Sequence, residues 1–325
     1  MEEWAFVDAD AATLIADARA GDSDAFRRLT QPHHRELQVH CYRMLGSFQD
    51  AEDALQETLL AAWQGLARFE SRASVRTWLY TIATNRCLNF RRSASSRRAK
   101  EWNVPGLVPP EPSRMGDIVW LQPYPDSSLA AEQAETISLA FVTALQTLPP
   151  RQVAVLLLRD VLDFPASEVA EMLDSTLDSV NSALARARGS LRDRQRSGEP
   201  APTSLSPAES TVVEAFVRAY QASDVDAVVA LLTDDVFISM PPMPFEYLGI
   251  DDATAMCHTI LEGRTFELVS TRANGQPAFG TYLLGADGSK HGTGMMVLTL
   301  SGDRISALTR FEAGVLPWFG LPRAL

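Results

Sequence analysis

The chain has 325 residues, of which 46% are hydrophobic, and its formal net charge is −12. The length predicts two or three compact domains. The sequence shows no pattern typical of a secretion leader and no run of about 18 apolar residues. We therefore expect a cytoplasmic protein with no membrane contact. Cys41, Cys87 and Cys257 are widely spaced, which predicts neither a disulfide framework nor a metal site.

The acidic total conceals two basic segments. Residues 68–100 contain nine lysines and arginines against one acid, and residues 186–196 contain five arginines against Asp193. These segments carry +8 and +4, which leaves −24 for the rest of the chain. Because salt screens a charge beyond about 10 Å, contact with phosphate depends on such local segments. The pattern predicts local contact with nucleic acid by a protein that a partner brings there.

Proline-rich segments divide the chain. Residues 99–127 and 197–207 cannot continue a helix and are expected to be linkers. In the first linker, Trp120 and Tyr124 are candidate anchors, either on neighbouring domains or on a partner. We expect a multidomain fold with all-α units at residues 12–98 and 128–196 and an α+β unit at residues 208–325.

Residues 50–69 form a strong amphipathic pattern in the first unit. Apolar residues recur at intervals of three and four, which predicts a helix with one buried face. The opposite face fits either a solvated surface or a contact with a partner, and its polar residues are Glu52, Asp53, Gln56, Glu57 and Gln64.

The next segment, residues 75–92, mixes three kinds of side chain. Trp78, Tyr80 and Phe90 are interleaved with four arginines and two asparagines. Aromatic rings stack on unpaired bases and arginines neutralise phosphate, so the mixture is typical of a surface for single-stranded or opening DNA. Trp78 fits the core of the unit equally well.

Together the two segments resemble the second conserved region of group IV sigma factors, the extracytoplasmic-function type. The resemblance covers nearly the whole first unit, because DAEDALQETLLAAWQGLARFE at residues 50–70 is followed by VRTWLYTIATNRCLNFRR at residues 75–92. It implies a factor that binds core RNA polymerase and recognises and opens promoter DNA. It also implies a protein that needs no cofactor and catalyses no reaction.

The resemblance assigns roles to individual residues. It implies that Asp53, Gln56 and Glu57 contact the clamp helices of the largest polymerase subunit. It further implies that a loop would hold a flipped base of the −10 promoter element and that a helix would follow the melted strand. The residues concerned are Phe69, Arg72, Ser74, Arg76, Trp78, Asn85, Arg86, Asn89, Arg91 and Arg92.

The second unit predicts three helices separated by short turns. Pro150 opens the first helix, Ser167 is placed to cap the second, and Ser175 with Asp178 resembles a capping box at the third. Two short helices at this spacing predict a helix-turn-helix, whose second helix enters the major groove. The apolar positions expected on the buried side of that helix are Leu177, Val180, Leu184, Ala187 and Leu191.

This unit resembles the fourth region of the same family. The resemblance implies contact with the flap of the second-largest polymerase subunit and with the −35 promoter element. The chain has Asn181 and Ala183 where family members often have basic residues, which leaves fewer contacts for guanine or phosphate. A solvated arginine face is the alternative. The residues implied to contact DNA are Ser175, Asn181, Ser182, Arg186, Arg188 and Arg192.

The third unit begins with helices and ends with alternating strand-like segments. This order resembles the SnoaL-like branch of the nuclear-transport-factor-2 superfamily, a cone-shaped α+β fold with a pocket. We expect the domain to pack on the two sigma regions and to modulate their activity, and a separate anti-sigma factor is a further possible partner. Candidate pocket residues, which also fit an ordinary core, are Met240, Met243, Phe245 and Trp318. Helices are expected at residues 212–220, 225–232 and 253–261, and strands at 236–240, 266–273, 278–284, 292–300 and 305–312.

Other classes of function have to be weighed. The cone fold also hosts enzymes, and the candidates for acid–base chemistry are Asp234, Asp235, Glu246, His258 and His291. The sequence shows no nucleophile beside a base and no metal-ligand spacing, so we expect no catalysis. A helix-turn-helix regulator with a ligand-sensing C-terminal domain is the alternative, but it leaves residues 50–92 without a purpose.

Overall fold

The computed structural model describes residues 2–70, 73–93, 108–129, 135–195 and 207–325. The chain divides into two compact units. Unit 1 is Met1–Ser95 with Leu148–Arg188, and unit 2 is Ser96–Thr147 with Gly189–Leu325. None of the helices in the described ranges is both long enough and apolar enough to cross a membrane. Arg72, one of the predicted DNA contacts, lies outside these ranges.

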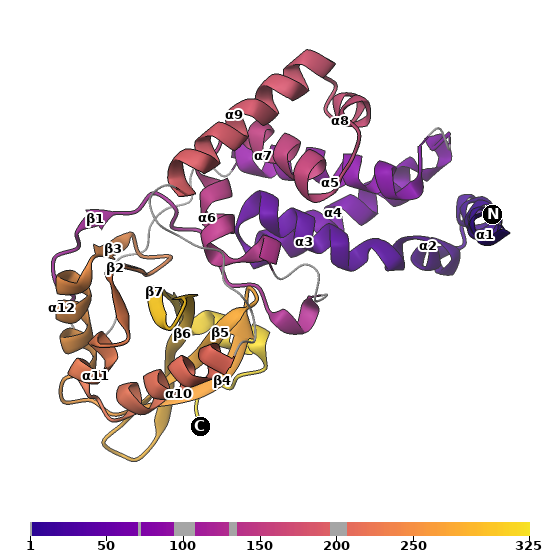
Figure 1. Ribbon diagram of the computed structural model, residues 1–325. Coiled ribbons are helices and arrows are strands. Elements are labelled where there is room, and N and C mark those ends of the chain that lie inside the picture. Colours follow the sequence, from indigo (N-terminus) through magenta and orange to yellow (C-terminus); the bar gives the residue numbers. More distant parts are fainter. Residues whose placement is uncertain (1, 71–72, 94–107, 130–134, 196–206) are drawn as a thin grey trace. The chain divides into compact units, whose positions relative to one another are not determined.

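Unit 1 is helical, as predicted (Figure 1). A π-helical turn, Leu157–Val161, follows α7. The helices are α1 (Glu2–Arg19), α2 (Ser23–Thr30), α3 (His34–Leu45), α4 (Phe48–Gly65), α5 (Val75–Ser93), α7 (Pro150–Leu156), α8 (Ala166–Met172) and α9 (Leu177–Gln195), the last of which continues beyond the unit.

The start of α4 follows from its sequence. The Ser47 hydroxyl accepts a hydrogen bond from the Asp50 amide at 3.2 Å, which satisfies one of the free amides of the first turn. Ala51, Ala54 and Ala62 have no exposed surface, so small side chains let α4 pack closely on its neighbours. The amphipathic pattern predicted at residues 50–69 is confirmed as this helix.

The caps of the helix-turn-helix differ from those predicted. Pro165 is the N-cap of α8, and Ser167 lies inside the helix. At α9, the Thr176 hydroxyl accepts the Ser179 amide at 3.2 Å, so the capping residue is Thr176 and the prediction of Ser175 was wrong. Asp174 adopts the left-handed conformation, with a φ of 46°, in the turn before α9. The N-cap therefore falls on Thr176, one residue later than predicted.

The first apolar position predicted for α9 was also wrong. Leu177 is 49% exposed, whereas Val180, Leu184 and Ala187 are buried. Because α9 begins at Leu177 itself, this residue lies in the first turn, at the free end of the helix.

Unit 2 has the predicted α+β fold. One mixed sheet has the strand order β1-β3-β2-β7-β6-β5-β4, and β2 and β7 are parallel while the other pairs are antiparallel. The strands are β1 (Arg114–Met115), β2 (Leu232–Ser239), β3 (Phe245–Leu248), β4 (Phe266–Ala273), β5 (Gln276–Leu284), β6 (Lys290–Ser301) and β7 (Arg304–Glu312). The helices are α6 (Leu139–Gln146), α10 (Pro207–Gln221), α11 (Val225–Val229) and α12 (Ile250–Leu261).

The apolar core of unit 2 lies between one face of this sheet and helices α10 to α12. Phe216 of α10, Met256 of α12 and Leu298 of β6 are buried members of it. Five predicted strands are confirmed, while β1 and β3 were not predicted. The helix predicted at residues 225–232 ends at Val229, because Leu232 already belongs to β2.

Candidate nucleic-acid interface

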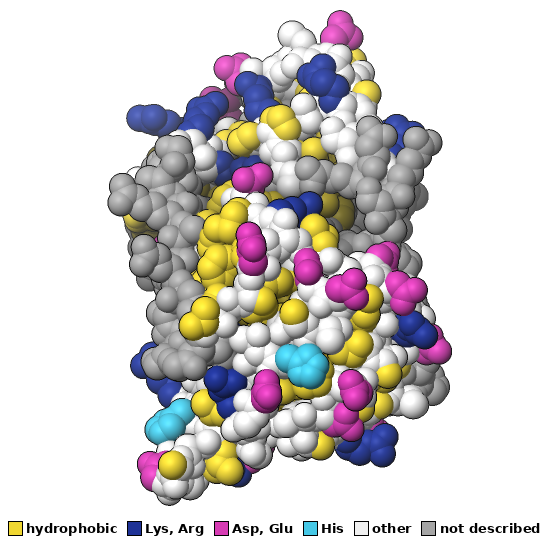
Figure 2. All heavy atoms as spheres, turned by 90° about the vertical axis from the view of Figure 1, so that its left-hand side faces the viewer, with side chains coloured by type: hydrophobic (Ala, Val, Ile, Leu, Met, Phe, Trp, Pro, Cys, Tyr) yellow, Lys and Arg dark blue, Asp and Glu magenta, His cyan; other side chains and the backbone are white. Residues whose placement is uncertain are grey.

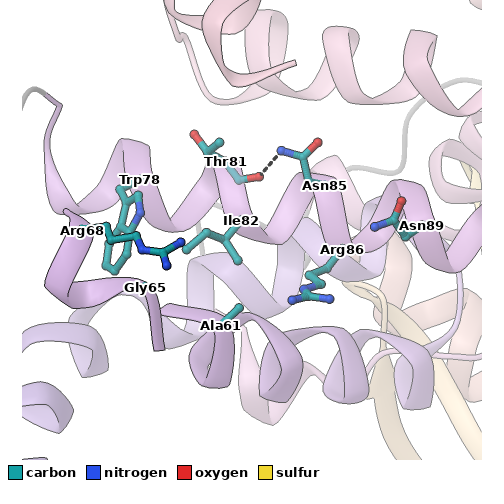
Figure 3. A pocket seen from close by; sticks show the side chains of 9 residues that line it. All are labelled: Ala61, Gly65, Arg68, Trp78, Thr81, Ile82, Asn85, Arg86 and Asn89. Carbon is teal, nitrogen blue, oxygen red and sulfur yellow. Dashed lines mark hydrogen bonds between the residues drawn. The ribbon is translucent and has the colours of Figure 1, made fainter. Parts of the chain in front are cut away.

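A pocket of about 540 Å³ is lined by residues of α4, α5 and the turn that follows α4. In Figure 3, Ile82 and Arg86 extend from α5 towards α4, whereas Thr81, Asn85 and Asn89 extend from the other side of α5. Four residues predicted for the −10 element line it together: Trp78, Asn85, Arg86 and Asn89. The other five lining residues were not predicted as contacts, and they are Ala61, Gly65, Arg68, Thr81 and Ile82. Thr81 and Ile82 carry no charge or large ring, so only their helical spacing from Trp78 and Asn85 could have indicated them.

Trp78 is both a packing residue and a pocket residue. Its ring stacks on Phe69 with the ring centroids 4.6 Å apart, and Phe69 belongs to an apolar cluster with Leu14 and Ile15 of α1. Phe69 is only 7% exposed, so in this structure it packs against the Trp78 ring and is not accessible to a base. The two readings of Trp78 from sequence are therefore compatible.

Amide and guanidinium groups complete the pocket. The Asn85 amide donates to the Thr81 carbonyl at 2.9 Å, the bond drawn in Figure 3, and also to the Met172 carbonyl of α8 at 3.2 Å. The Arg86 guanidinium lies 3.9 Å from the Glu57 carboxylate, both half-exposed. Asn89 and Arg68 are exposed. The pocket therefore combines a ring, two cations and two amides.

Two predicted phosphate contacts are engaged elsewhere in unit 1. Arg76 binds the Glu36 carboxylate at 3.1 Å, and its guanidinium carbon lies 4.9 Å from the ring centres of both Tyr80 and Phe164. Arg91 donates to the main-chain carbonyl oxygens of Met44 and Leu148, at 3.3 and 3.0 Å. Both guanidinium groups are thus engaged by neighbouring groups of unit 1, although the Arg76 side chain stays 37% exposed.

The two remaining residues of this set differ in exposure and role. Ser74 caps α5, because its hydroxyl accepts the Thr77 amide at 3.0 Å. Arg92 is exposed near the end of α5.

The predicted polymerase face of α4 is exposed. Asp53, Gln56 and Glu57 all lie on the surface, and Leu60, one turn further on, is 57% exposed. The spacing of three and four residues places these side chains on one face. Leu60 was not predicted because it falls outside the apolar stripe, yet a leucine on the polar side of an amphipathic helix itself indicates a contact surface.

The predicted −35 contacts lie along α9. Asn181, Ser182, Arg186 and Arg192 are exposed, whereas Ser175 is half-buried in the turn. Arg188 is exposed too, but one edge of its guanidinium is already engaged, because Nε and Nη2 donate to the two carboxylate oxygens of Asp160 at 2.8 and 2.7 Å.

Comparison with known proteins agrees with this geometry. Three family models match in order along the chain: Sigma-70 region 2 at residues 29–97, Sigma-70 region 4 at 138–191 and a SnoaL-like domain at 213–308. The ECF RNA polymerase sigma factor SigG of Mycobacterium tuberculosis is 38% identical over 95% of this chain and 86% of its own length. The chain belongs to the ECF RNA polymerase sigma factors.

Two further relatives are consistent with this family. SigM of M. tuberculosis is 34% identical over 55% of this sigma factor and 82% of SigM. The crystal structure of M. tuberculosis SigJ has a TM-score of 0.56 with 23% identity, and it covers 86% of this chain and 93% of SigJ. The likeness to SigJ shows a shared fold, and the predicted fold class is confirmed.

In the C-terminal domain of this sigma factor, the predicted pocket residues do not form one set. Met240 and Met243 are buried in the core, and Phe245 packs against it. Trp318 lies in a 3-10 helix, Ala313–Phe319, and is not a member of that core.

A hollow of about 400 Å³ lies instead between α6 and the opposite face of the sheet. Phe237, Thr299 and Ala307 line it, whereas their neighbours Ile238, Leu298 and Leu308 point into the core.

The candidate acid–base residues are dispersed. Asp235 and Glu246 border the hollow, but Glu246 forms an ion pair with Arg114 at 2.5 Å. His258 lies on α12 and His291 on β6. Figure 2 shows acidic side chains scattered singly over the visible face, and the described residues contain no group of three histidines, cysteines or carboxylates able to hold a metal ion.

The sheet of the C-terminal domain binds the first linker. Residues 114–115 form β1, which pairs with the edge strand β3. Further along, the Tyr124 amide donates to the Asn274 side-chain oxygen at 2.8 Å, and the Asn274 amide donates back to the Tyr124 carbonyl at 2.9 Å. The Asn274 side-chain nitrogen donates to the Ile137 carbonyl at 2.6 Å.

Two further contacts extend this attachment. The Leu139 amide at the start of α6 donates to the Gln276 side chain at 3.0 Å. Arg272 bridges Asp126 of the linker, at 3.3 Å, and Glu209 of α10, at 2.7 Å. The Tyr124 side chain has no exposed surface, so this predicted anchor packs within unit 2.

Proposed function

We propose that this sigma factor binds core RNA polymerase through the exposed face of α4 and holds melted promoter DNA in the pocket beside α5. The observation that carries the proposal is that Trp78, Arg86 and Asn89 all line one open pocket. Asp53, Gln56, Glu57 and Leu60 would supply the polymerase contact, with Leu60 as its apolar centre.

The pocket chemistry suits an unpaired base. The Trp78 ring offers a stacking surface, and Arg68 and Arg86 can neutralise phosphate. The Asn89 amide can donate to and accept from a base edge, whereas Asn85, whose side-chain nitrogen already donates to two main-chain carbonyls, can offer its oxygen as an acceptor. The −35 element would be read in the major groove by α9, through Asn181, Ser182 and Arg186, with Arg192 on phosphate. The helix-turn-helix regulator without polymerase is not favoured, because it gives the α4–α5 pocket no role.

For the C-terminal domain we propose a regulatory role without catalysis. The dispersed acid–base candidates support the second part. The attachment of the linker to Asn274 and of α6 to Gln276 supports the first, because the linker joins the two DNA-binding regions in sequence. A separate anti-sigma factor remains a prediction.

The test is promoter-specific transcription by holoenzyme reconstituted from core polymerase and the full chain. The variant pair Asn85→Ala with Arg86→Gln should retain polymerase binding but lower opening of the promoter, measured by permanganate reactivity of unpaired thymines. Arg28→Gln, which removes one exposed charge from α2, is the control and should transcribe normally. Absence of any holoenzyme would refute the polymerase contact, and unchanged opening in the double variant would refute the role of the pocket.

A further inference from the structure

Large apolar side chains are exposed at few places in unit 1. Among the described residues of this unit, they are Leu60 and Trp63 of α4 and Leu177 of α9. Leu60 belongs to the face proposed to bind polymerase, and Trp63 lies one turn further along the same helix. Leu177 is 49% exposed, and neither proposed contact of α4 accounts for it.

Leu177 is the first residue of α9, the second helix of the helix-turn-helix. The Thr176 hydroxyl caps this helix by accepting the Ser179 amide at 3.2 Å, which fixes Leu177 in the first turn. In helix-turn-helix proteins, the N-terminal residues of the second helix contact base edges in the major groove. Leu177 is therefore placed where bases are read, and the exposed Asn181 lies one turn further on the same side of the helix.

The first two turns of α9 carry no basic side chain. Residues 177–185 contain neither lysine nor arginine, and the first arginine of the helix is Arg186. Guanine is most often read by the donors of an arginine or a lysine, which these turns lack. Asp178, exposed in the first turn, is repelled by phosphate and adds no general attraction for DNA. Base recognition by these turns therefore relies on apolar contact and on side chains without a positive charge.

We propose that Leu177 selects a thymine in the −35 element by packing on its 5-methyl group. Among the four bases only thymine presents a methyl group in the major groove, so an apolar contact there distinguishes it from the other three. The contact removes apolar surface of both the leucine and the methyl group from water, which stabilises the complex. This inference rests on the proposed reading of the −35 element by α9, and it names one base that this reading requires.

The experiment uses holoenzyme assembled from core polymerase and the full chain. Promoters with a randomised −35 region are first selected by binding, which gives the preferred sequence. Each thymine of the preferred duplex, on either strand, is then replaced by uracil, which removes the 5-methyl group and leaves every hydrogen-bonding group of the base in place. At one position, uracil should weaken binding about threefold to fivefold, the effect expected for one methyl group.

Variants assign the methyl effect to the leucine. Leu177→Ala should weaken binding to the thymine duplex by a similar factor and make the holoenzyme insensitive to uracil at that position. Because Leu177 is half-exposed and alanine is a good helix former, α9 should keep its fold. Leu177→Met keeps a large apolar side chain and should keep the sensitivity. Leu284→Ala, which shortens a leucine that is 43% exposed on β5 of the C-terminal domain, is the control and should behave as wild type does.

The outcomes separate this inference from the proposed function. A methyl effect that is present in the wild type and lost in Leu177→Ala would establish the contact. A −35 preference that uracil leaves unchanged at every position, or a uracil effect that persists in Leu177→Ala, would overturn the role of Leu177 alone. If the holoenzyme forms but shows no −35 preference, the proposed reading by α9 fails and the inference fails with it.

Discussion

Some arginines of unit 1 are bound by neighbouring groups of the protein, and others line an open pocket. Arg76 and Arg91 sit on the helix that was predicted to follow DNA, but they bind a carboxylate, two rings and main-chain carbonyl oxygens. Arg68 and Arg86 line an open pocket. A count of basic residues cannot make this distinction. Whether an arginine is engaged depends on the face of the helix from which its side chain extends and on the residues that pack against that face.

Arg188 of α9 offers a test of the same idea. Its fork is occupied by Asp160 across two hydrogen bonds, so phosphate has to compete with a carboxylate. Asp160→Asn should strengthen promoter binding by holoenzyme and steepen its salt dependence by about one phosphate contact. The measurement is affinity for −35 DNA at several salt concentrations. Asp163→Asn makes the same charge change nearby and is the control; equal effects of both would show that only net charge matters.

His40 of α3 predicts a pH dependence of stability. Burial, with the charges of Arg43 and Arg76, lowers its pKa to about 3, against a partial opposing effect of Glu36. His40 is therefore neutral in the fold and shares a 2.9 Å hydrogen bond with the Thr84 hydroxyl. In the unfolded chain it binds a proton below about pH 6.5.

The sign follows from this difference in protonation. As the pH falls below 6.5, the unfolded state takes up the proton and the free energy of unfolding should drop by about 1.4 kcal/mol per pH unit, down towards pH 3. His40→Gln should lessen that slope. Urea unfolding of both proteins at pH 7.5, 6.0 and 5.0 measures it, and parallel curves for the two proteins would contradict the assignment.

At the scale of elements, hydrophobic periodicity predicted the helices and strands whose patterns are long and regular. The helices α4, α5 and α10 and the strands β4 to β7 were all predicted near their observed positions. The strands β1 and β3 were not, since they have only two and four residues and are too short for alternation to show. Their pairing depends on contacts between residues more than 130 positions apart, such as Arg114 with Glu246.

The candidate site was predictable to a similar extent. The resemblance selected Trp78, Asn85, Arg86 and Asn89, which the fold brings together. It also selected Phe69, Arg76 and Arg91, which the fold engages internally. Residue type suggested DNA contact in both groups, and only the packing of α1, α3 and the residues Leu148 and Phe164 separates them.

The packing of α8 on α5 is itself testable. The Glu168 carboxylate accepts a hydrogen bond from Thr77 at 3.4 Å, and Asn85 donates to the Met172 carbonyl. These contacts hold α5, the helix proposed to bind melted DNA, against α8 of the helix-turn-helix. Separation of the two elements would therefore expose more of α5 to a melted strand.

Glu168→Lys should favour that separation, because it removes the acceptor of the Thr77 hydroxyl. We expect the full chain to bind single-stranded −10 DNA several-fold more tightly, measured by fluorescence anisotropy. Glu171→Lys changes the charge equally on the same short helix, where the glutamate is exposed, and is the control. If both variants gain the same affinity, added positive charge explains the gain and opening of the packing does not.

At the scale of the whole molecule, the division into units does not follow the order of the chain. Residues 108–129 and 135–147 belong to the predicted first linker and the start of the predicted second helical unit, yet they group with the C-terminal domain. The connection between the two DNA-binding regions is thus held by a third domain. Any change that loosens this attachment should alter how freely those regions can adopt the spacing that a promoter requires.

Asn274 bonds two separate segments of this attachment, at Tyr124 and at Ile137. It has no exposed surface, its side chain bonds both Tyr124 and Ile137, and its φ is +58°. Asn274→Ala would leave buried groups without partners, at about 1–3 kcal/mol each, and would add the strain of a left-handed alanine. Asn274→Gly removes the same hydrogen bonds without that strain. We expect both variants to make residues 108–129 more sensitive to limited proteolysis and to change promoter-specific transcription by holoenzyme, with the C-terminal core still folded. Increased proteolysis with unchanged transcription would show that the domain holds the linker without regulating the factor.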